Sequence, residues 1–200
     1  MKILAIDTTS EQGSIALTER DRVIEEVILR SPDGFAHVVF GQIEAMLARH
    51  SLTLRDIDAF ASASGPGTFT GVRVGLTAVK GLAEALARPV VAVSNLRALA
   101  SLGTAELRAP VIDARRGEIY GAVYNAALEP VQDEVVMKLE AWKAALPEGA
   151  EIVDQPRPLA AAIGKIAARE LAAGRGQTPE QIDANYVRRS DAELLWKDVR

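Results

Sequence analysis

Two segments of this chain repeat one strand–turn–strand pattern, and the repeat limits the folds that the chain can adopt. The matching residues stand at one constant offset: Ile6, Asp7 and Ala16 in the first segment, and Ile112, Asp113 and Ala122 in the second. Each segment is typical of a buried strand that ends in aspartate, followed by a polar turn and a returning strand. A duplicated α/β fold accounts for the repeat. Two unrelated hairpins that both end in aspartate would also account for it, and the residues leave both explanations open.

Strand and helix patterns alternate along the chain, which predicts a mixed α/β protein. In the first half we expect strands at 2–7, 14–18, 22–29, 57–64 and 90–93, and helices at 35–49, from the glycine-rich loop to about 87, and at 95–100. In the second half we expect strands at 110–113, 118–124, 134–137 and 151–153, and helices at 139–146 and 159–173. A break near residues 104–108 divides the chain into 1–103 and 104–200. The expected fold is therefore α/β, with two duplicated lobes of mixed sheet, the second shortened.

Composition excludes several kinds of functional site. The 200 residues contain no cysteine and two histidines, His37 and His50. A disulfide framework, a thiolate zinc site, an iron–sulfur cluster and a cysteine nucleophile are therefore excluded. The net charge of −4 argues against broad electrostatic binding of nucleic acid. Neither a membrane-length apolar run nor a signal-peptide pattern occurs, so we expect a cytoplasmic protein that makes no membrane contact.

A glycine-rich loop, Gly65-Pro66-Gly67-Thr68-Phe69-Thr70-Gly71, opens the second expected helix. An anion could bind at the amino end of that helix, but glycines also allow close packing, and the spacing favours packing. Along the helix, small residues including Gly71 and Gly75 form one stripe, and Val72, Leu76 and Val79 belong to a second, apolar stripe. A helix that is apolar on two faces must be covered twice. We expect one face to pack on the chain's own sheet and the other on helix 35–49 or on a partner.

Four segments together resemble the TsaB (YeaZ) family of bacterial proteins needed to make threonylcarbamoyladenosine in tRNA. They are I-L-A-I-D-T-T at 3–9, G-P-G-T-F-T-G-V-R-V-G at 65–75, V-I-D-A-R-R-G-E-I-Y at 111–120, and Y-V-R-R-S-D-A-E at 186–193. The glycine-rich segment is the most specific of the four. The closing segment departs from the family pattern, because Asn185 stands where the family often has proline before the tyrosine.

The resemblance implies an actin-like ATPase (ribonuclease H-like) fold and a function as a partner subunit. Members of this family pair with the related catalytic subunit TsaD, and a small ATPase, TsaE, joins the complex. The subunit is a non-catalytic scaffold in this scheme, tRNA is contacted only indirectly, and a homodimer is plausible when TsaD is absent. Because the family uses its first-lobe helices at the subunit interface, the expected interface residues are Phe35, His37, Val39, Gly71, Val72, Gly75, Leu76 and Val79.

The two hairpin turns also suggest a nucleotide site. In a duplicated α/β fold they would face each other across a cleft, where turn amides cradle phosphate and carboxylates hold magnesium through water. The candidate residues are Asp7, Thr8, Thr9, Asp113 and Arg115. ATP or ADP with magnesium at the complex interface stays open on this basis. A free-standing ATP-binding phosphotransferase or ATPase is the alternative function.

Histidine spacing argues against catalysis by this chain. The catalytic relatives carry two metal-binding histidines four residues apart on one helix, whereas here His37 is followed four residues later by Gly41. We therefore expect no metal site and no catalytic residue, which also speaks against a metallopeptidase. His37 is better explained as a partner-facing or capping residue, and His50 as a cation at a helix end. The tryptophans Trp142 and Trp196 are expected to be packing residues.

Overall fold

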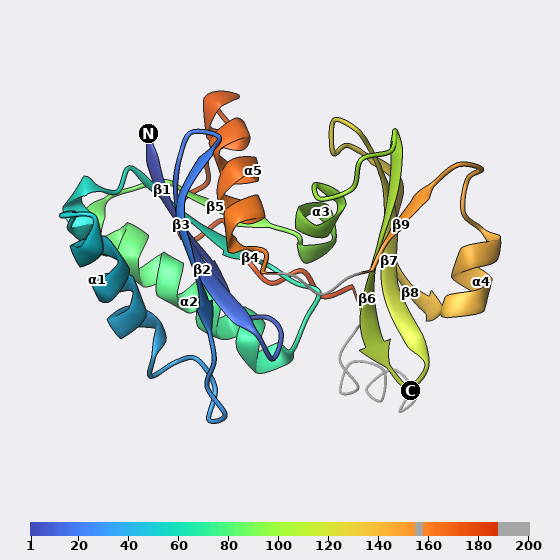
Figure 1. Ribbon diagram of the computed structural model, residues 1–200, viewed down its shortest axis with the longest axis horizontal. Helices are drawn as coiled ribbons and strands as arrows, with labels where there is room; N and C mark the ends of the chain where they lie inside the picture. The colour runs from blue at the N-terminus through green and yellow to red at the C-terminus, as the bar shows by residue number, and fades with distance from the viewer. Residues whose placement is uncertain (155–157, 188–200) are drawn as a thin grey trace, which may run out of the picture.

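The computed structural model contains two mixed β-sheets with helices on and between them, and describes residues 1–154 and 158–187 (Figure 1). The first sheet consists of β1 (Lys2–Asp7), β2 (Gly13–Glu19), β3 (Arg22–Leu29), β4 (Ala59–Ala63) and β5 (Val90–Val93). The second consists of β6 (Leu107–Arg115), β7 (Glu118–Asn125), β8 (Pro130–Lys138) and β9 (Glu151–Val153). The helices are α1 (Val39–Arg49), η1 (Leu54–Asp56), α2 (Phe69–Leu86), α3 (Asn95–Ala100), α4 (Leu139–Ala144) and α5 (Ala160–Ala172).

Strand β1 forms the centre of the first sheet, whose order is β3-β2-β1-β4-β5. It pairs antiparallel with β2 and parallel with β4, and both of its faces are covered. Leu4 and Ile6 belong to the core under α1 and α2, whereas Ile3 and Ala5 belong to the core under α5. Successive side chains of a strand point to opposite faces, so a nearly continuous apolar run is what this central position requires.

The second sheet repeats the topology of the first. Its order is β8-β7-β6-β9, with β6 antiparallel to β7, β7 antiparallel to β8, and β6 parallel to β9. The same order and pairing relate β3, β2, β1 and β4. The predicted duplicated lobes of mixed sheet are therefore confirmed. Among the described residues, the second sheet contains no strand equivalent to β5.

Two helices lie between the sheets, and each packs on the sheet of the other half of the chain (Figure 1). Helix α3 follows β5 but packs on β6 and β7, while α5 follows β9 but packs on β1 and β2. At Gly164 of α5, an added Cβ would lie 2.8 Å from Cγ2 of Thr18. The helix can therefore approach β2 this closely because glycine has no side chain. Each half of the chain therefore contributes a helix that packs on the sheet of the other half, while the strands of the two sheets come from separate halves.

An ion pair fastens α3 to α5. Arg97 Nη2 lies 2.7 Å from Oε1 of the largely buried Glu170, and Arg97 Nε donates to the carbonyl of Leu128 in the β7–β8 turn. Arg175 binds the other oxygen of Glu170. Hydrogen bonding from Arg175, followed by that from Arg97, lowers the pKa of Glu170. Arg97, from the first half of the chain, therefore anchors α5 of the second half.

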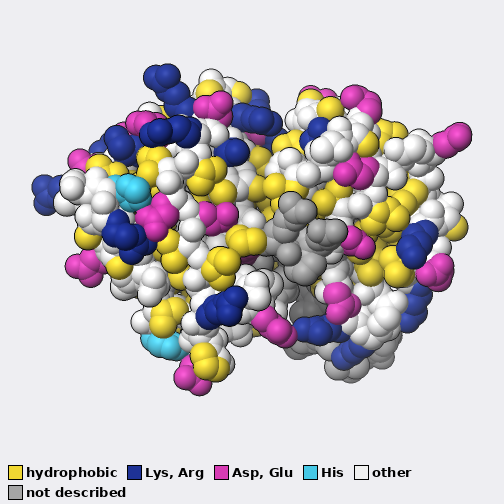
Figure 2. All heavy atoms as spheres, viewed as in Figure 1, with side chains coloured by type: hydrophobic (Ala, Val, Ile, Leu, Met, Phe, Trp, Pro, Cys, Tyr) yellow, Lys and Arg dark blue, Asp and Glu magenta, His cyan; other side chains and the backbone are white. Residues whose placement is uncertain are grey.

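Most predicted elements occur at or near their expected bounds, but β6 and β8 are longer than expected and α1 is shorter. The helix begins at Val39 rather than Phe35, because 36–38 form turns and Val38 provides no side-chain cap. Charged side chains of both signs are interspersed over the visible face of the molecule (Figure 2). Within residues 1–154 and 158–187, no helix combines the length and the apolar character that a membrane crossing requires.

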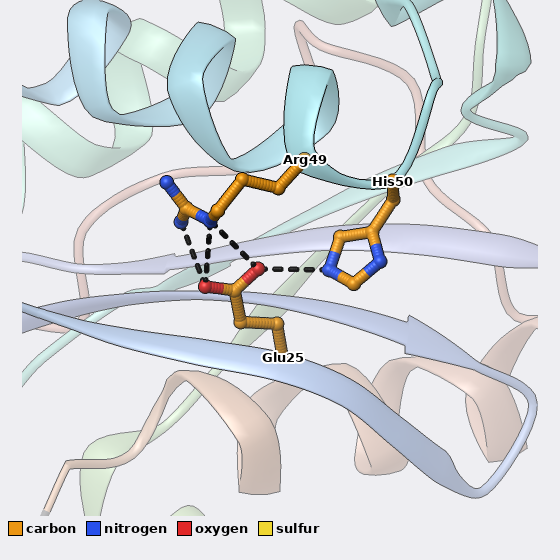
Figure 3. Close-up of polar contacts among 3 residues, drawn as sticks. All are labelled: Glu25, Arg49 and His50. Carbon is orange, nitrogen blue, oxygen red and sulfur yellow. Dashed lines mark hydrogen bonds and ion pairs between the residues drawn. The ribbon is translucent and has the colours of Figure 1, made fainter.

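A surface ion cluster holds the end of α1 against β3 (Figure 3). Glu25 of β3 accepts hydrogen bonds from Arg49 Nε (3.1 Å) and Nη2 (2.7 Å), and its other oxygen lies 2.8 Å from His50 Nε2. Hydrogen bonding from Arg49, with a smaller contribution from His50, lowers the pKa of the Glu25 carboxyl. His50 does stand at the carboxyl end of α1, as expected, but it also contacts a carboxylate from the neighbouring strand.

We predict that Glu25→Gln lowers the free energy of unfolding at neutral pH by about 0.5–1 kcal/mol, the upper part of the range for exposed ion pairs. Because the pKa of Glu25 is lower in the folded chain, this stabilisation exists above the ordinary glutamate pKa and is lost as the pH falls through the folded-state pKa. Urea unfolding should therefore show a difference between the two proteins that disappears at acid pH. Glu44→Gln, which removes an exposed carboxylate from α1, the helix that the ion cluster holds, is the control. A difference that persists at strongly acid pH would contradict the assignment.

Candidate functional site

Three of the predicted nucleotide-binding residues, Asp7, Thr8 and Thr9, lie in a buried turn at the end of β1. Oδ1 of Asp7 accepts hydrogen bonds from the Thr9 N–H (3.0 Å) and from the Thr9 hydroxyl (2.6 Å). Thr8 Oγ1 donates to the carbonyl of Gly71 (2.7 Å). Burial raises the pKa of the Asp7 carboxyl, and the hydrogen bonds from Thr9 and Asn95 oppose that rise. The polar groups of this turn are therefore directed into the protein.

Asn95, the first residue of α3, joins this turn to the glycine-rich loop. Its Nδ2 donates to Thr9 Oγ1 (2.7 Å), and its Oδ1 accepts from the N–H of Gly65 (3.0 Å). Its own N–H donates to the carbonyl of Gly65 (2.9 Å). A buried amide costs free energy unless its donors and acceptors are paired. Here one side chain pairs groups from the β1 turn, the loop and α3.

The glycine-rich loop lies directly on the β1 turn. The N–H of Thr68 donates to the carbonyl of Thr9 (2.7 Å), and Thr68 Oγ1 caps α2 by accepting from the N–H of Gly71. An added Cβ would lie 2.0 Å from the Thr8 carbonyl oxygen at Gly71, and 2.6 Å from the Thr9 Cβ at Gly67. Both glycines are therefore required for close approach of two backbone segments, which agrees with the packing explanation of this motif.

The second hairpin turn has the same backbone hydrogen bond but is open to solvent. Asp113 Oδ1 accepts from the N–H of Arg115 (2.8 Å), as Asp7 Oδ1 accepts from the N–H of Thr9. Arg115 Nη2 reaches Glu11 in the first hairpin turn at 3.6 Å, so the two turns do face each other. However, the side chains of Asp113 and Arg115 are 66% and 75% exposed. The predicted nucleotide residues are thus adjacent, but only those of the second turn point into solvent.

A groove of about 430 Å³ runs between α1 and α2, on the face of the first sheet that lies away from the second sheet. Its lining includes Val39 and Phe40 of α1 and Phe69, Arg73, Val74 and Thr77 of α2. Phe40 and Phe69 are 51% and 55% exposed, which is unusual for side chains of this size. Exposed apolar surface rimmed by polar residues marks interaction sites on soluble proteins. This α1–α2 groove is the strongest candidate binding surface among the described residues.

An aromatic and cationic cluster lies at one end of the α1–α2 groove. Tyr186 stacks on Phe69 with ring centroids 6.1 Å apart, and the guanidinium carbon of Arg73 lies 3.7 Å from the centroid of the Phe69 ring. Arg73 Nε also donates to the Tyr186 hydroxyl (3.3 Å). Phe69 and Arg73 are one helical turn apart, and Tyr186 arrives from the far end of the chain. Tyrosine and arginine are enriched among the residues that dominate binding energy at interfaces.

Most of the expected interface residues lie inside this chain rather than on its surface. Phe35, Val39, Val72, Leu76 and Val79 are buried in this chain's own core, and Gly71 and Gly75 face Thr8 and Ser62. Both stripes of α2 are thus covered internally, which leaves the intervening face with Phe69, Arg73 and Thr77 in solvent. That face escaped the sequence analysis because its apolar residues alternate with polar ones. The large aromatic residues that begin the helices, Phe40 and Phe69, were the available signal.

His37 is exposed and lies outside the α1–α2 groove lining. Its Nε2 is 3.3 Å from the Ser31 hydroxyl. Within the described ranges, no three side chains of histidine, aspartate or glutamate are grouped as metal ligands would be. His37 is thus placed as a surface residue near the start of α1, and Trp142 is buried against the second sheet as predicted. Trp196, Arg188 and Arg189 lie outside the described residues.

Asn185, the departure from the family pattern, ties the closing segment to the junction between the sheets. Its N–H donates to the carbonyl of Ser64 (2.7 Å), a bond that proline could not make. Its Nδ2 donates to Glu134 (2.6 Å), which also accepts from the Tyr124 hydroxyl and from Ser94, the N-cap of α3. Burial raises the pKa of the Tyr124 phenol. The closing segment is therefore held beside both the α1–α2 groove and the junction.

Comparisons with known proteins place the chain among proteins of tRNA modification. The family model described as "TsaD: tRNA N6-adenosine threonylcarbamoyltransferase" matches residues 35–172. The "tRNA threonylcarbamoyladenosine biosynthesis protein TsaB" of Bacillus subtilis is 37% identical over 153 residues, which are 74% of this chain and 67% of the relative. The protein of that name from Escherichia coli is 35% identical over 149 residues, 70% of this chain and 64% of the relative. The matched region thus spans about two thirds of the length of each of these two relatives.

A solved structure covers more of the chain. YeaZ from Pseudomonas aeruginosa superposes with a TM-score of 0.79 and 30% identity, over 92% of this chain and 99% of the YeaZ chain. The same arrangement of elements is therefore present in a solved relative, and the expected α/β fold with two duplicated mixed sheets is confirmed.

We predict that Gly71→Ala destabilises the fold by about 2–3 kcal/mol or more, because the new methyl group overpacks a backbone contact. Gly81→Ala is the matched control, since Gly81 lies in the same helix and an added Cβ there meets nothing within 4 Å. That substitution should stabilise the protein by about 0.5–1 kcal/mol, the helix preference of alanine over glycine. Thermal or urea unfolding measures both. Equal stability of the two variants would show that close packing of Gly71 on the Thr8 carbonyl is not required for the fold.

Proposed function

The chain belongs to the TsaB (YeaZ) family, and we propose that it acts in tRNA threonylcarbamoyladenosine biosynthesis as a non-catalytic subunit that binds and activates a TsaD-type catalytic subunit. The observation that carries the proposal is the exposed α1–α2 groove with its cluster of Phe69, Arg73 and Tyr186. The family model supports the choice of partner, because residues 35–172 of this chain match the model of the transferase TsaD itself. Related subunits that share a fold can pair through equivalent surfaces.

The state of the β1 turn supports a binding function over a catalytic one. A turn that holds phosphate must present free backbone amides to it. Here Asp7, Thr8 and Thr9 bond to one another, to Gly71 and to Asn95, while the glycine-rich loop covers them. A nucleotide at this turn would have to displace buried hydrogen bonds, each of which is costly to leave unmade. The free-standing phosphotransferase and the metallopeptidase are therefore weaker explanations.

Other components of the complex fit the same scheme. We propose that a TsaE-type ATPase and tRNA act through the catalytic subunit, and that this chain contacts tRNA only indirectly, since its net charge is −4. Nucleotide with magnesium remains a candidate in the complex, and the exposed residues that this chain offers to it are Asp113 and Arg115. Without its partner, the α1–α2 groove of one copy would cover that of a second copy, because exposed aromatic side chains favour burial.

We predict that Phe69→Asp weakens binding to the catalytic subunit at least about thirtyfold, the effect of losing roughly 2 kcal/mol at a central interface residue. Phe40→Asp should weaken it as well. Both side chains are half exposed, so the free variants should retain wild-type circular dichroism and melting. Binding of purified subunits is measured by interferometry, and the complex by size-exclusion chromatography.

Val131→Asp is the matched control for that experiment. Val131 is 50% exposed and lies on β8 of the second sheet, outside the α1–α2 groove. It should leave the dissociation constant unchanged. If Phe69→Asp and Val131→Asp affect binding equally, the α1–α2 groove is not the interface. If the wild-type chain does not bind the catalytic subunit at micromolar concentration, the proposed function itself fails.

A further inference from the structure

A second cavity lies between the two sheets, at the end remote from the hairpin turns. Its volume is about 370 Å³, and its lining includes Arg108 at the start of β6, Leu128 in the β7–β8 turn, and Lys165, Ile166 and Arg169 of α5. Arg108 pairs with Tyr124 at one end of the β6–β7 hairpin, whereas the β6–β7 turn lies at the other end of these strands (Figure 1). This α5 cavity is therefore distinct from the Asp7–Asp113 turns and from the α1–α2 groove.

Positive charge dominates the α5 cavity. Lys165 and Arg169 are exposed, stand one helical turn apart, and make no side-chain hydrogen bond or ion pair with other described residues. Arg108 donates from Nε to the carbonyl of Ala105 (2.8 Å). The one carboxylate in the lining, Glu26, accepts from the N–H of Ala161 (2.9 Å) in the first turn of α5. The lining thus holds three cations and one carboxylate, in a chain whose net charge is −4. Arg108 has a further carboxylate nearby, Glu151, so the unbalanced positive charge is that of Lys165 and Arg169.

The surroundings show that this excess is local. Arg97, which lies beside the cavity under Leu128, is neutralised by Glu170, and Arg175 binds the same carboxylate. Figure 2 shows Lys and Arg side chains gathered along the top of the part that carries α1, α2 and α5. Cations that converge on a concave surface without counter-ions attract anions and repel one another when none is bound.

The cavity wall is apolar between these charges. Leu128 and Ile166 are buried and line it together with alanine side chains. Ligand sites for small molecules have volumes of this order and combine apolar walls with a few convergent polar groups. Arginine binds phosphate oxygens through paired N–H groups, and lysine binds them as a point charge.

We propose that the α5 cavity binds an organic phosphate, with its phosphate groups on Lys165, Arg169 and Arg108 and its apolar or aromatic part against Leu128 and Ile166. The bound molecule would contact α5, which packs on the first sheet, and also β6 and the β7–β8 turn of the second sheet. It would therefore stabilise the arrangement of the two sheets. The proposal rests on the cavity alone and does not depend on the catalytic partner.

Isothermal titration calorimetry at constant ionic strength tests this site, with ADP and inorganic pyrophosphate as the probes. ADP should bind saturably at one site per chain, and more tightly than pyrophosphate, because only ADP has a part that contacts the apolar wall. Arg169→Gln should weaken ADP binding at least about tenfold, the loss of one charge-assisted contact. Lys165→Gln should act in the same direction. Unchanged melting temperatures show that the exposed substitutions leave the fold intact.

Arg55→Gln is the matched control, because it removes the same charge from an exposed residue outside the cavity lining, and it should leave ADP binding unchanged. Arg115→Gln tests the alternative site at the hairpin turns. Loss of binding in Arg115→Gln but not in Arg169→Gln would place the ligand at the hairpin turns and overturn the proposal. Equal affinity for the two probes would overturn the organic-phosphate assignment. No saturable binding of either probe up to about 1 mM would overturn the site as a whole.

Discussion

The contact between Gly71 and the carbonyl of Thr8 determines how the first half of the molecule is built. A side chain at position 71 would occupy the position of the Thr8 oxygen, so α2 can approach the sheet this closely only with glycine there. The hydrogen bonds from Thr8 to Gly71 and from Thr68 to Thr9 then fix the rotation of α2 about its axis and the distance of its first turn from the β1 turn. That rotation determines which face of α2 remains outside. The α1–α2 groove is a consequence of how the glycine-rich loop closes on the β1 turn.

The same closure buries the polar groups of the β1 turn within the chain. The duplicated hairpins have kept their common geometry, with an aspartate that accepts from the backbone two residues later in each. In the first hairpin, however, Asn95 bonds both to the turn and to the glycine-rich loop, whereas the second hairpin turn is open to solvent. A motif that suggests anion binding when read alone here holds backbone against backbone. The side chains that are exposed for binding lie instead along the α1–α2 groove and around the α5 cavity.

Sequence reasoning predicted the elements and the duplication well, because both depend on local periodicity and on residues such as Asp7 and Asp113 at equivalent positions. It did not predict which face of α2 is exposed, since Gly75, Leu76 and Thr77 differ by fractions of a turn and only the tertiary contact at Gly71 sets the rotation. It also could not place α5, because an alanine-rich helix can pack on either sheet. Tyr186 reaches Phe69 from the far end of the chain, a contact that no local pattern reveals.

Hydrogen–deuterium exchange, measured on the chain alone and on its complex with the catalytic subunit, tests the central claim that the β1 turn is closed and the outer helices bind. The amides of Thr9, Thr68 and Gly71 are hydrogen-bonded within the chain, so they should exchange slowly before any partner or nucleotide is added. Binding should add protection at 36–40 and 69–78 and none at 8–12. Fast exchange of the turn and loop in the free chain, with new protection there and not at the α1–α2 groove, would contradict the account.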